Sequence, residues 1–226
     1  MRLAALLILL ASPLAAQEFV EAPGPLSDDD FYRAVSCGAD PGGTCRKPVL
    51  RWPEAKRGAL TVSLSSTTPV MEPWQRTLYD AGLDAAVDQI NGVDAGIRLV
   101  RTTAETADIE IHIVATPPGQ IMENTGVQGL DGNRLALGRV ALRARDSEIR
   151  EALIAVSIAA RRREIASVLL EEITQALGLM TDVSGPAYRR SVFSEDSNSV
   201  VRLQGQDAMA LRRHYATDSD QPDEDS

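Results

Sequence analysis

Apolar and polar residues alternate through the middle of the chain in a pattern that predicts β-strands. In "ALTVSLSST", the apolar residues from Leu60 to Leu64 recur at every second position, which is typical of a strand with one buried face. "GIRLV" and "DIEIHIV" predict two more strands, and the three isoleucines of the latter, Ile109 to Ile113, should point inward. "LALGRVALRA" and "EALIAVSIA" predict another pair. We therefore expect a mixed sheet of four or five strands.

Helical periodicity marks the segments around these strands. "PWQRTLYDAGLDAAVDQING" begins at Pro73, a residue suited to the first helical position, and ends at Asn91-Gly92, so a backing helix is predicted there. A second long helix is expected at 162–177 and a short one at 207–215. Ser27 and Asp30 resemble a helix-capping pair and predict a short amino-terminal helix. The fold class expected is α+β.

The helix at 162–177 has two different faces. Glu171 and Gln175 lie one turn apart, and at about 100° per residue they fall opposite the apolar residues. The apolar face comprises Ile165, Val168, Leu169, Ile173 and Ala176. Thr174 and Gly178 join the polar side, so solvent or a cleft is expected beyond Glu171 and Gln175.

The amino terminus predicts export. "MRLAALLILLASPLAAQEF" has a basic residue at Arg2, a short apolar run and small residues at Ala15 and Ala16, which is the plan of a secretory signal. The run is shorter than the roughly 20 residues that span a bilayer, so no stable membrane anchor is expected. We expect a signal peptide at 1–16, an amino-terminal segment at 17–58, one domain at 59–216 and a tail at 217–226.

Charge and cysteine content narrow the class of protein. The net charge of -9 is concentrated in the closing "DSDQPDEDS", which reads as a disordered, solvated tail, and it disfavours nucleic acid as a partner. Cys37 and Cys45 are the two cysteines in "SCGADPGGTC". In an exported protein, this count and close spacing favour a disulfide over a redox pair or a metal site.

The segment "EEITQALGLMTD" carries a family resemblance. It resembles the active-site helix of zincin metallopeptidases of the metzincin type, whose pattern is H-E-x-x-H-x-x-G-x-x-H. More specifically, the chain from about Leu60 to Tyr215 is similar to a proteobacterial family, domain of unknown function 2927. There a degenerate "EExTQxLGL" helix is followed by an aspartate and a "SIF"-like segment, here Asp182 and Ser191 to Phe193. The resemblance implies a zincin-like fold in a Gram-negative bacterium, periplasmic or secreted.

The resemblance also assigns roles to the residues of the motif. Glu171, Gln175 and Thr181 take the places of the three histidines, Glu172 that of the general base, and Gly178 that of the turning glycine. A catalytic zinc needs about three imidazole or anionic ligands, whereas Gln175 offers an amide oxygen and Thr181 a protonated hydroxyl. Asp182 could replace the third ligand. Because these candidate ligands suit zinc poorly, we expect the protein to bind no cofactor. The alternative is that it binds zinc.

The two histidines do not repair the site. His112 and His214 lie far from the motif in sequence and show no ligand spacing, so each is expected to be a surface or partly packed residue. Glu172 could act as a base only with a metal-bound water, because a carboxylate alone gives little peptide hydrolysis. Glu171 and Glu172 could equally be two exposed acids on a helix.

Two hypotheses of function remain. The first is a non-catalytic, exported zincin-like domain that binds a protein or peptide partner in the cell envelope, with an exposed sheet edge accepting an extended strand. The alternative is a metal-dependent peptidase or other hydrolase with Glu171, Gln175 and Asp182 as metal ligands and Glu172 as catalytic base. Ligand chemistry favours the first.

Overall fold

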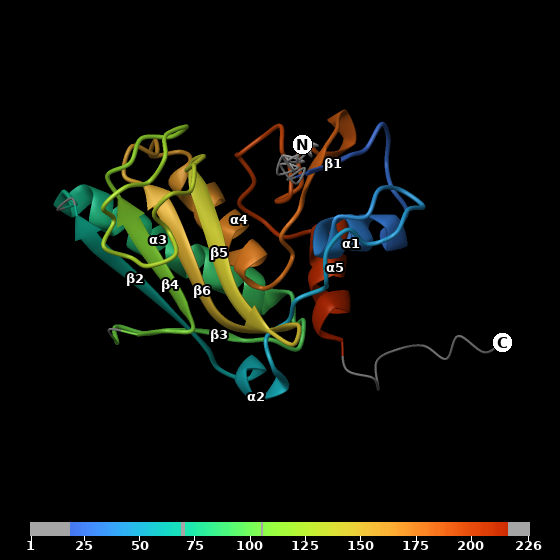
Figure 1. The fold of residues 1–226 in the computed structure, drawn as a ribbon, viewed down its shortest axis with the longest axis horizontal. Helices are drawn as coiled ribbons and strands as arrows, with labels where there is room; N and C mark the ends of the chain where they lie inside the picture. The colour runs from blue at the N-terminus through green and yellow to red at the C-terminus, as the bar shows by residue number, and fades with distance from the viewer. Residues whose placement is uncertain (1–18, 69–70, 105, 217–226) are drawn as a thin grey trace, which may run out of the picture.

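The computed structural model describes residues 19–68, 71–104 and 106–216 (Figure 1). Its elements in chain order are β1 (Phe19–Glu21), α1 (Asp28–Cys37), α2 (Glu54–Arg57), β2 (Leu60–Thr68), α3 (Pro73–Gly92), β3 (Leu99–Arg101), β4 (Ile109–Val114), β5 (Gly138–Arg145), β6 (Glu148–Ser157), α4 (Ile165–Ala176), β7 (Asp182–Ser184), the 3-10 turn η1 (Pro186–Tyr188) and α5 (Gln206–Tyr215). The predicted strands and helices are confirmed, with boundaries shifted by a few residues.

Five strands form the main sheet in the order β3-β2-β4-β6-β5. The pairings among β3, β2, β4 and β6 are parallel, whereas β5 joins β6 as an antiparallel hairpin and ends the sheet. This confirms the expected mixed sheet. The hairpin turn uses Asp146 and Ser147, both with positive φ, which matches the right-handed twist of the two strands.

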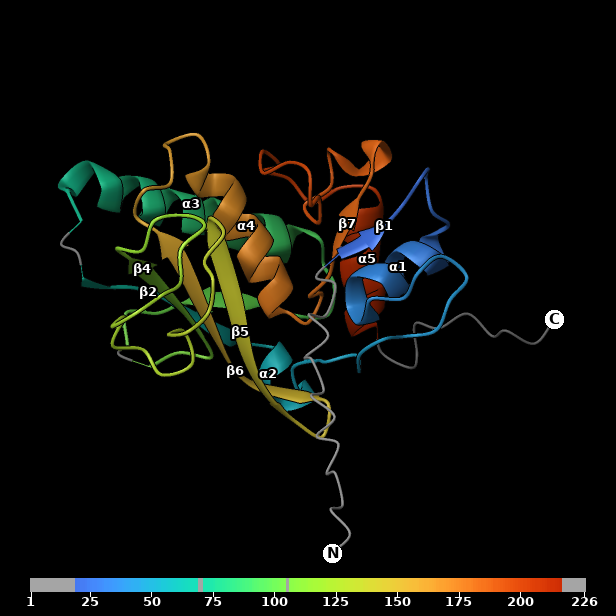
Figure 2. The same ribbon diagram turned by 45° about the horizontal axis from the view of Figure 1, so that its top comes forward.

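Both faces of this sheet are covered. Helices α3 and α4 lie together on one face, and the loop at 115–137 covers the other face with a small apolar cluster of its own (Figure 2). The close approach of the two helices depends on Gly82, where a Cβ would lie 2.9 Å from Leu169 Cδ1. The three isoleucines of β4 are fully buried beneath the helices, as predicted.

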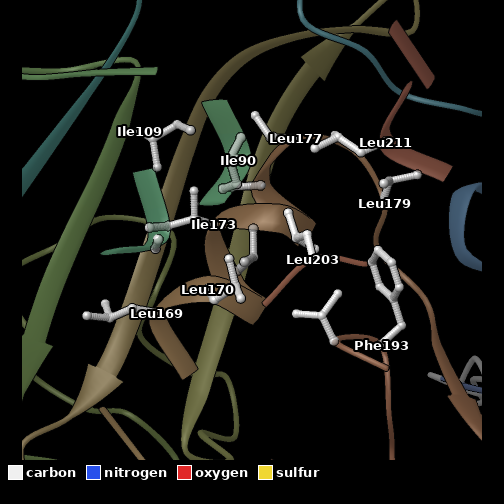
Figure 3. Packing of buried hydrophobic residues seen from close by; sticks show 14 of the residues in the cluster. Ile90, Ile109, Leu169, Leu170, Ile173, Leu177, Leu179, Phe193, Leu203 and Leu211 are labelled. Carbon is white, nitrogen blue, oxygen red and sulfur yellow. The ribbon is translucent and has the colours of Figure 1, made fainter. Parts of the chain in front are cut away.

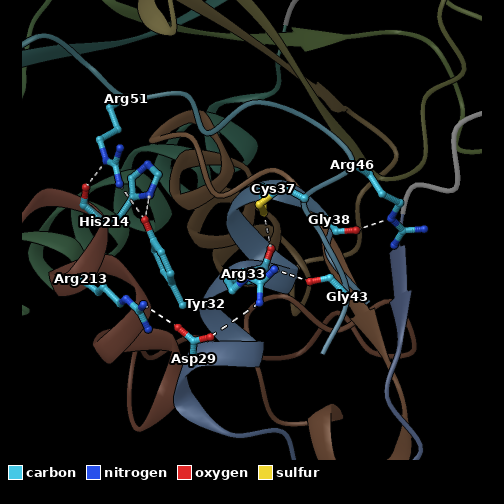
Figure 4. The surroundings of a disulfide bond; sticks show 11 residues. Asp29, Tyr32, Arg33, Cys37, Gly38, Gly43, Arg46, Arg51, Arg213 and His214 are labelled. Atoms are coloured by element: carbon cyan, nitrogen blue, oxygen red, sulfur yellow. Dashed lines mark hydrogen bonds and ion pairs between the residues drawn. A yellow bond between two sulfur atoms is a disulfide. The ribbon is translucent and has the colours of Figure 1, made fainter. Parts of the chain in front are cut away.

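A smaller part of the molecule lies beyond α4, formed by α1, α5 and the two-stranded parallel sheet β1-β7. The side-chain oxygen of Ser27 accepts a hydrogen bond from the backbone N–H of Asp30, so Ser27 caps α1 as the sequence predicts. Cys37 and Cys45 form the predicted disulfide, which closes the loop after α1 (Figure 4). The loop turns at Gly38, whose φ of 67° ends the helix in the left-handed conformation.

Helix α4 is packed on two sides, which corrects the expectation of a single apolar face. Leu169 and Ile173 lie toward Ile90 of α3 and the sheet, whereas Leu170 lies on the side of Phe193 and Leu203 (Figure 3). The cause is the segment after α4, which folds back over the helix and supplies a second set of apolar side chains. The helix therefore has very little solvent-facing surface.

Some predictions fall on residues outside the described ranges. The predicted signal peptide at 1–16 and the acidic tail at 217–226 are both in this group. Among the helices that the structure does describe, none combines the length and apolarity needed to cross a membrane.

Candidate functional site

The two glutamates of the motif occupy different environments on α4. Glu171 is half-buried, whereas Glu172 is only 5% exposed. This corrects the interpretation of the pair as two exposed acids. Adjacent helical residues diverge by about 100°, so the Glu172 side chain points toward the sheet while the Glu171 side chain remains partly exposed to solvent.

Glu172 lies directly against the edge strand. A Cβ built on Gly138 of β5 would fall 2.3 Å from Glu172 Oε1, so the missing side chain of Gly138 provides the space that the carboxyl occupies. The other oxygen, Glu172 Oε2, is buried without a hydrogen-bond partner. A buried polar atom without a partner carries a desolvation cost, and a charged one carries more.

Asp182 is brought to the same place by the turn after α4. The side-chain amide nitrogen of Gln175, Nε2, donates a hydrogen bond to Asp182 Oδ1 at 2.9 Å. This bond joins the helix to the start of β7. The segment after Phe193 then runs alongside β7: Val183 donates to the Phe193 carbonyl, and the amide of Glu195 donates to the Val183 carbonyl. This backbone pairing carries Glu195 into the neighbourhood of Asp182.

Four carboxyl groups therefore share one electrostatic environment, which we call the acidic cluster: Glu171, Glu172, Asp182 and Glu195. Burial raises the pKa of Glu171 well above its usual range, and the charges of the other three members raise it further. Burial also raises the pKa of Glu172, Asp182 adds to the effect, and the Arg139 guanidinium on β5 opposes it. Like charges and desolvation together favour protonation or an incoming cation.

The predicted metal ligands converge only in part. Glu171 and Asp182 interact through their charges, and Gln175 contacts Asp182, but it does so through its amide nitrogen rather than the oxygen that a metal would need. Across the described ranges, no group of three or more His, Cys, Asp and Glu residues is placed to hold a metal ion. As arranged, these side chains do not fit a catalytic zinc.

Neither histidine is a surface residue. His112 is 6% exposed, bonded through Nδ1 to Ser65 and lying 3.3 Å from Glu110 through Nε2. His214 is 1% exposed and packs in the smaller part of the molecule. The sequence prediction of partly packed residues underestimates the burial of both side chains.

Gly178 serves a structural role at the end of α4. Its φ is 101°, and a Cβ there would lie 2.0 Å from the Leu50 carbonyl oxygen and 2.8 Å from His214 Nε2. His214 Nε2 itself bonds the Leu50 carbonyl at 2.9 Å. The turning glycine of the motif is thus required because three segments of the chain meet at this point.

The last carbonyls of α4 are satisfied by buried aromatic side chains. The indole of Trp52 donates to the Ala176 carbonyl at 2.9 Å, and the hydroxyl of Tyr215 donates to the Leu177 carbonyl at 2.6 Å. Arg51 donates to the His214 carbonyl and to the Tyr32 hydroxyl (Figure 4). We call this set of contacts the α4 joint: Leu50, Arg51, Trp52, Gly178, His214 and Tyr215.

The remaining motif residues are also structural. Thr181 is 1% exposed and lies beside Gly38 at the end of α1. Ser191 donates to Asp207 of α5 at 2.6 Å, and fully buried Phe193 packs edge-on to Phe31. The "SVF" segment therefore ties β7 to α5 and α1.

Sequence reasoning missed three residues of the site: Gly138, Arg139 and Glu195. Gly138 is the one with a detectable signal, because a glycine inside a strand pattern often marks a close approach. Arg139 lies 32 residues before Glu171 and Glu195 lies 13 residues after Asp182, and no local pattern connects either of them to the motif.

Comparison with known proteins gives one family and no characterised relative. No curated protein matches the chain. A family model described as "Protein of unknown function (DUF2927)" matches residues 34–218, which covers β2 to α5 and so contains both the acidic cluster and the α4 joint. The chain therefore belongs to the DUF2927 family of proteins of unknown function.

Proposed function

We propose that this protein is an exported, zincin-like domain without catalytic activity that binds an extended polypeptide segment in the cell envelope. The binding surface is the outer edge of β5, where the bound segment adds a sixth strand to the sheet. The observation that carries the proposal is that β5 ends the sheet beside the motif helix α4.

The backbone of β5 supports strand addition. In the described part of the chain, Gly138, Val140, Ala141 and Leu142 make no backbone-to-backbone hydrogen bond other than those within the sheet, so their outer N–H and C=O groups suit pairing with an added strand. An extended peptide that pairs with such an edge gains main-chain hydrogen bonds, and pockets for alternate side chains give specificity. The opposite edge, β3, has three residues and offers a much shorter ladder.

The two halves of β5 differ in how strongly they are protected against pairing with another strand. The half at 143–145 has a register shift and two exposed arginines, Arg143 and Arg145, features that discourage edge pairing. The half at 138–142 lacks a register shift and is half-buried or buried throughout. We therefore place the bound segment along 138–142.

The absence of catalysis rests on donor chemistry. A peptidase of the zincin type depends on metal to lower the pKa of water, and Gln175 presents its amide nitrogen to Asp182. Elemental mass spectrometry of the purified mature protein tests this directly, with Glu171→Ala and Gln175→Ala alongside wild type. Near-stoichiometric zinc that is lost in both variants would overturn the proposal in favour of a metal-dependent hydrolase.

Strand addition is tested with a displayed library of seven-residue peptides and hydrogen exchange. Peptides that bind should protect the backbone amides of residues 138–142. A lysine on the free edge opposes pairing, so Ala141→Lys should weaken binding about tenfold or more, whereas Ala144→Lys in the protected half should not. Binding that protects another surface, or that survives Ala141→Lys unchanged, would contradict the proposal.

A further inference from the structure

We infer that the protein docks reversibly on an anionic lipid surface through an exposed patch at one end of the main sheet. The patch consists of Trp74, in the first turn of α3, and three consecutive arginines in the loop before α4, Arg161, Arg162 and Arg163. We call these four residues the docking patch. None of them belongs to β5, so the inference does not depend on the proposed strand addition.

The three arginines are exposed and share one acid between them. The side chains of Arg161 and Arg163 are 70% and 74% exposed, and they lie 3.6 Å and 4.0 Å from the same carboxyl oxygen of Glu164. The other oxygen of Glu164 accepts the backbone N–H of Arg161 at 3.0 Å. The loop at 158–164 therefore carries an excess of positive charge in a chain whose net charge is -9.

Trp74 gives the docking patch an apolar component. Its side chain belongs to an exposed residue, at 44%, and the Cζ of Arg162 lies 4.3 Å from the centroid of its ring. This contact joins the loop before α4 to the start of α3, so the indole and the arginines share one surface. Tryptophan is enriched at membrane–water interfaces, and arginine recognises phosphate groups through charge-assisted hydrogen bonds.

The surface beside Arg163 is hollowed, which gives a lipid headgroup a place to enter. The cavity measures about 450 Å³ and is lined by Arg163, Glu164, Ser197, Asn198 and Ser199. Hydroxyl and amide donors next to a guanidinium group suit a phosphodiester. The acid that precedes this segment, Asp196, accepts the backbone N–H of Gly185 at 2.9 Å and is thus engaged elsewhere.

The net negative charge of the chain does not prevent local docking. Five of its acids lie within residues 217–226. Charges are screened beyond about 8 Å at physiological ionic strength, so the side chains at the contact dominate the attraction. The exposed indole favours a lipid surface over an acidic polypeptide, because its ring can enter the interface while its N–H stays hydrated.

Cosedimentation of the purified mature protein with lipid vesicles measures the docking. We expect binding to vesicles made of equal parts phosphatidylcholine and phosphatidylglycerol, and little binding to phosphatidylcholine alone. Each arginine at an anionic surface contributes about fivefold in partition, so the double variant Arg161→Gln/Arg163→Gln should bind about 25-fold more weakly. Glu72→Gln should have the opposite effect, because Glu72 is an exposed acid two residues before Trp74.

The matched control is the double variant Arg143→Gln/Arg145→Gln. These side chains are 68% and 83% exposed, and each is ion-paired with one acid. They lie at the hairpin that precedes β6, whereas the docking patch follows β6, and Figure 2 shows these two places at opposite ends of the strand. The control should bind vesicles as wild type does.

Tryptophan fluorescence locates the indole in the docked state. The chain has two tryptophans, of which Trp52 is 1% exposed and Trp74 is 44% exposed. Brominated phosphatidylglycerol in the vesicles should therefore quench Trp74 and leave Trp52 unchanged. In Trp74→Phe, the remaining emission should not be quenched.

The outcomes are distinct from those for strand addition. Equal weakening by the two arginine pairs would show attraction to positive charge in general and overturn the inference, as would absence of vesicle binding or of Trp74 quenching. A polyglutamate peptide that binds through Arg161 and Arg163, without vesicle binding, would assign the docking patch to an acidic polypeptide. Peptide protection of residues 138–142 is measured without lipid, so either proposal can fail while the other stands.

Discussion

The two parts of the motif helix differ in how their polar groups are satisfied. At the α4 joint, the last carbonyls of the helix accept hydrogen bonds from Trp52 and Tyr215, and His214 bonds Leu50. One to two turns earlier, the acidic cluster gathers like charges and leaves Glu172 Oε2 without a partner. The same helix thus ends in a joint whose last carbonyls are satisfied and carries, earlier in the motif, a buried carboxyl oxygen without a hydrogen-bond partner.

This difference separates stability from function within one helix. Buried polar groups in native structures are nearly always hydrogen-bonded, and the satisfied carbonyls of the joint are typical of a region whose role is structural. Buried acids with raised pKa values and no partner are costly, and such costs are concentrated at functional sites. Variants of the joint should therefore reduce stability, whereas removing the buried charge of Glu172 should leave stability unchanged or increase it.

The largest effect is expected for Gly178→Ala in the joint. The added Cβ would lie 2.0 Å from the Leu50 carbonyl oxygen at a φ of 101°, so the variant should lose about 4 kcal/mol or more of unfolding free energy, or fail to fold. Gly119→Ala is the matched control, because its φ is 86° and nothing lies within 4 Å. Backbone strain alone should cost the control about 1 to 2 kcal/mol in denaturant unfolding. Equal losses in the two variants would show that the contact at Gly178 is unimportant.

A smaller loss is expected for Trp52→Phe. The variant leaves the Ala176 carbonyl buried without its donor, which should cost about 1 to 3 kcal/mol in the same unfolding measurement. Trp74→Phe is the control, because Trp74 is 44% exposed and stacks under Arg162 at the surface. Its change should stay within about 0.5 kcal/mol. A Trp52→Phe protein as stable as wild type would mean that the joint tolerates an unpaired carbonyl.

Glu172→Gln should have the opposite sign. Burial raises the folded-state pKa of Glu172 above its ordinary value of 4.5, so its ionisation opposes folding increasingly as pH rises above 4.5. The neutral amide removes this cost, and the variant should gain about 1 kcal/mol or more at pH 8 and less at pH 4.5. Glu123→Gln, at an exposed position, should change stability little at either pH. A loss of stability at pH 8 would show that the ionised carboxylate has a favourable partner.

The sequence predicts the five strands of the main sheet and the helices α1, α3, α4 and α5 because each of them depends on a local pattern, whereas the short elements β1, β7 and α2 were not predicted. The isoleucines of β4 and the capping of α1 by Ser27 are examples in which a few neighbouring residues determine the result. The burial of α4 on two sides could not be predicted in this way, because Phe193 and Leu203 reach it from a segment that follows the helix. Of the site, Glu171, Gln175 and Asp182 were predicted as a group, and the structure brings them near one another.

The contributions of Gly138 and Glu195 depend on long-range pairing. The first is set by where the edge strand passes α4, and the second by the pairing of β7 with the segment after Phe193. Neither arrangement leaves a periodic pattern in the chain. The burial of Glu172 could not be predicted for the same reason, since a glutamate on a helix is usually solvated.

The last prediction concerns the protonation of the two histidines, and it needs no substitution. It compares the pKa of His214, in the joint, with that of His112, outside the joint. Burial lowers the pKa of His214 to about 3, and the charges of Arg51 and Arg57 contribute to the same direction. Burial also lowers the pKa of His112, although Glu110 opposes it. The His214 ring should therefore remain neutral in the folded protein at pH 5.

A pH titration followed by nuclear magnetic resonance measures the protonation of the two imidazole rings in the wild-type protein. At His214, the unfolded chain takes up a proton near pH 6.5 and the folded chain only near pH 3, so the contribution of His214 to stability is complete above pH 6.5 and declines as pH falls toward 3. The His214 ring shifts in the native protein should stay constant from pH 8 to pH 5, whereas His112 should titrate below its ordinary pKa of 6.5. A His214 ring that titrates near 6.5 would mean that the joint opens readily to water, and the contrast between a closed joint and an open cluster would no longer hold.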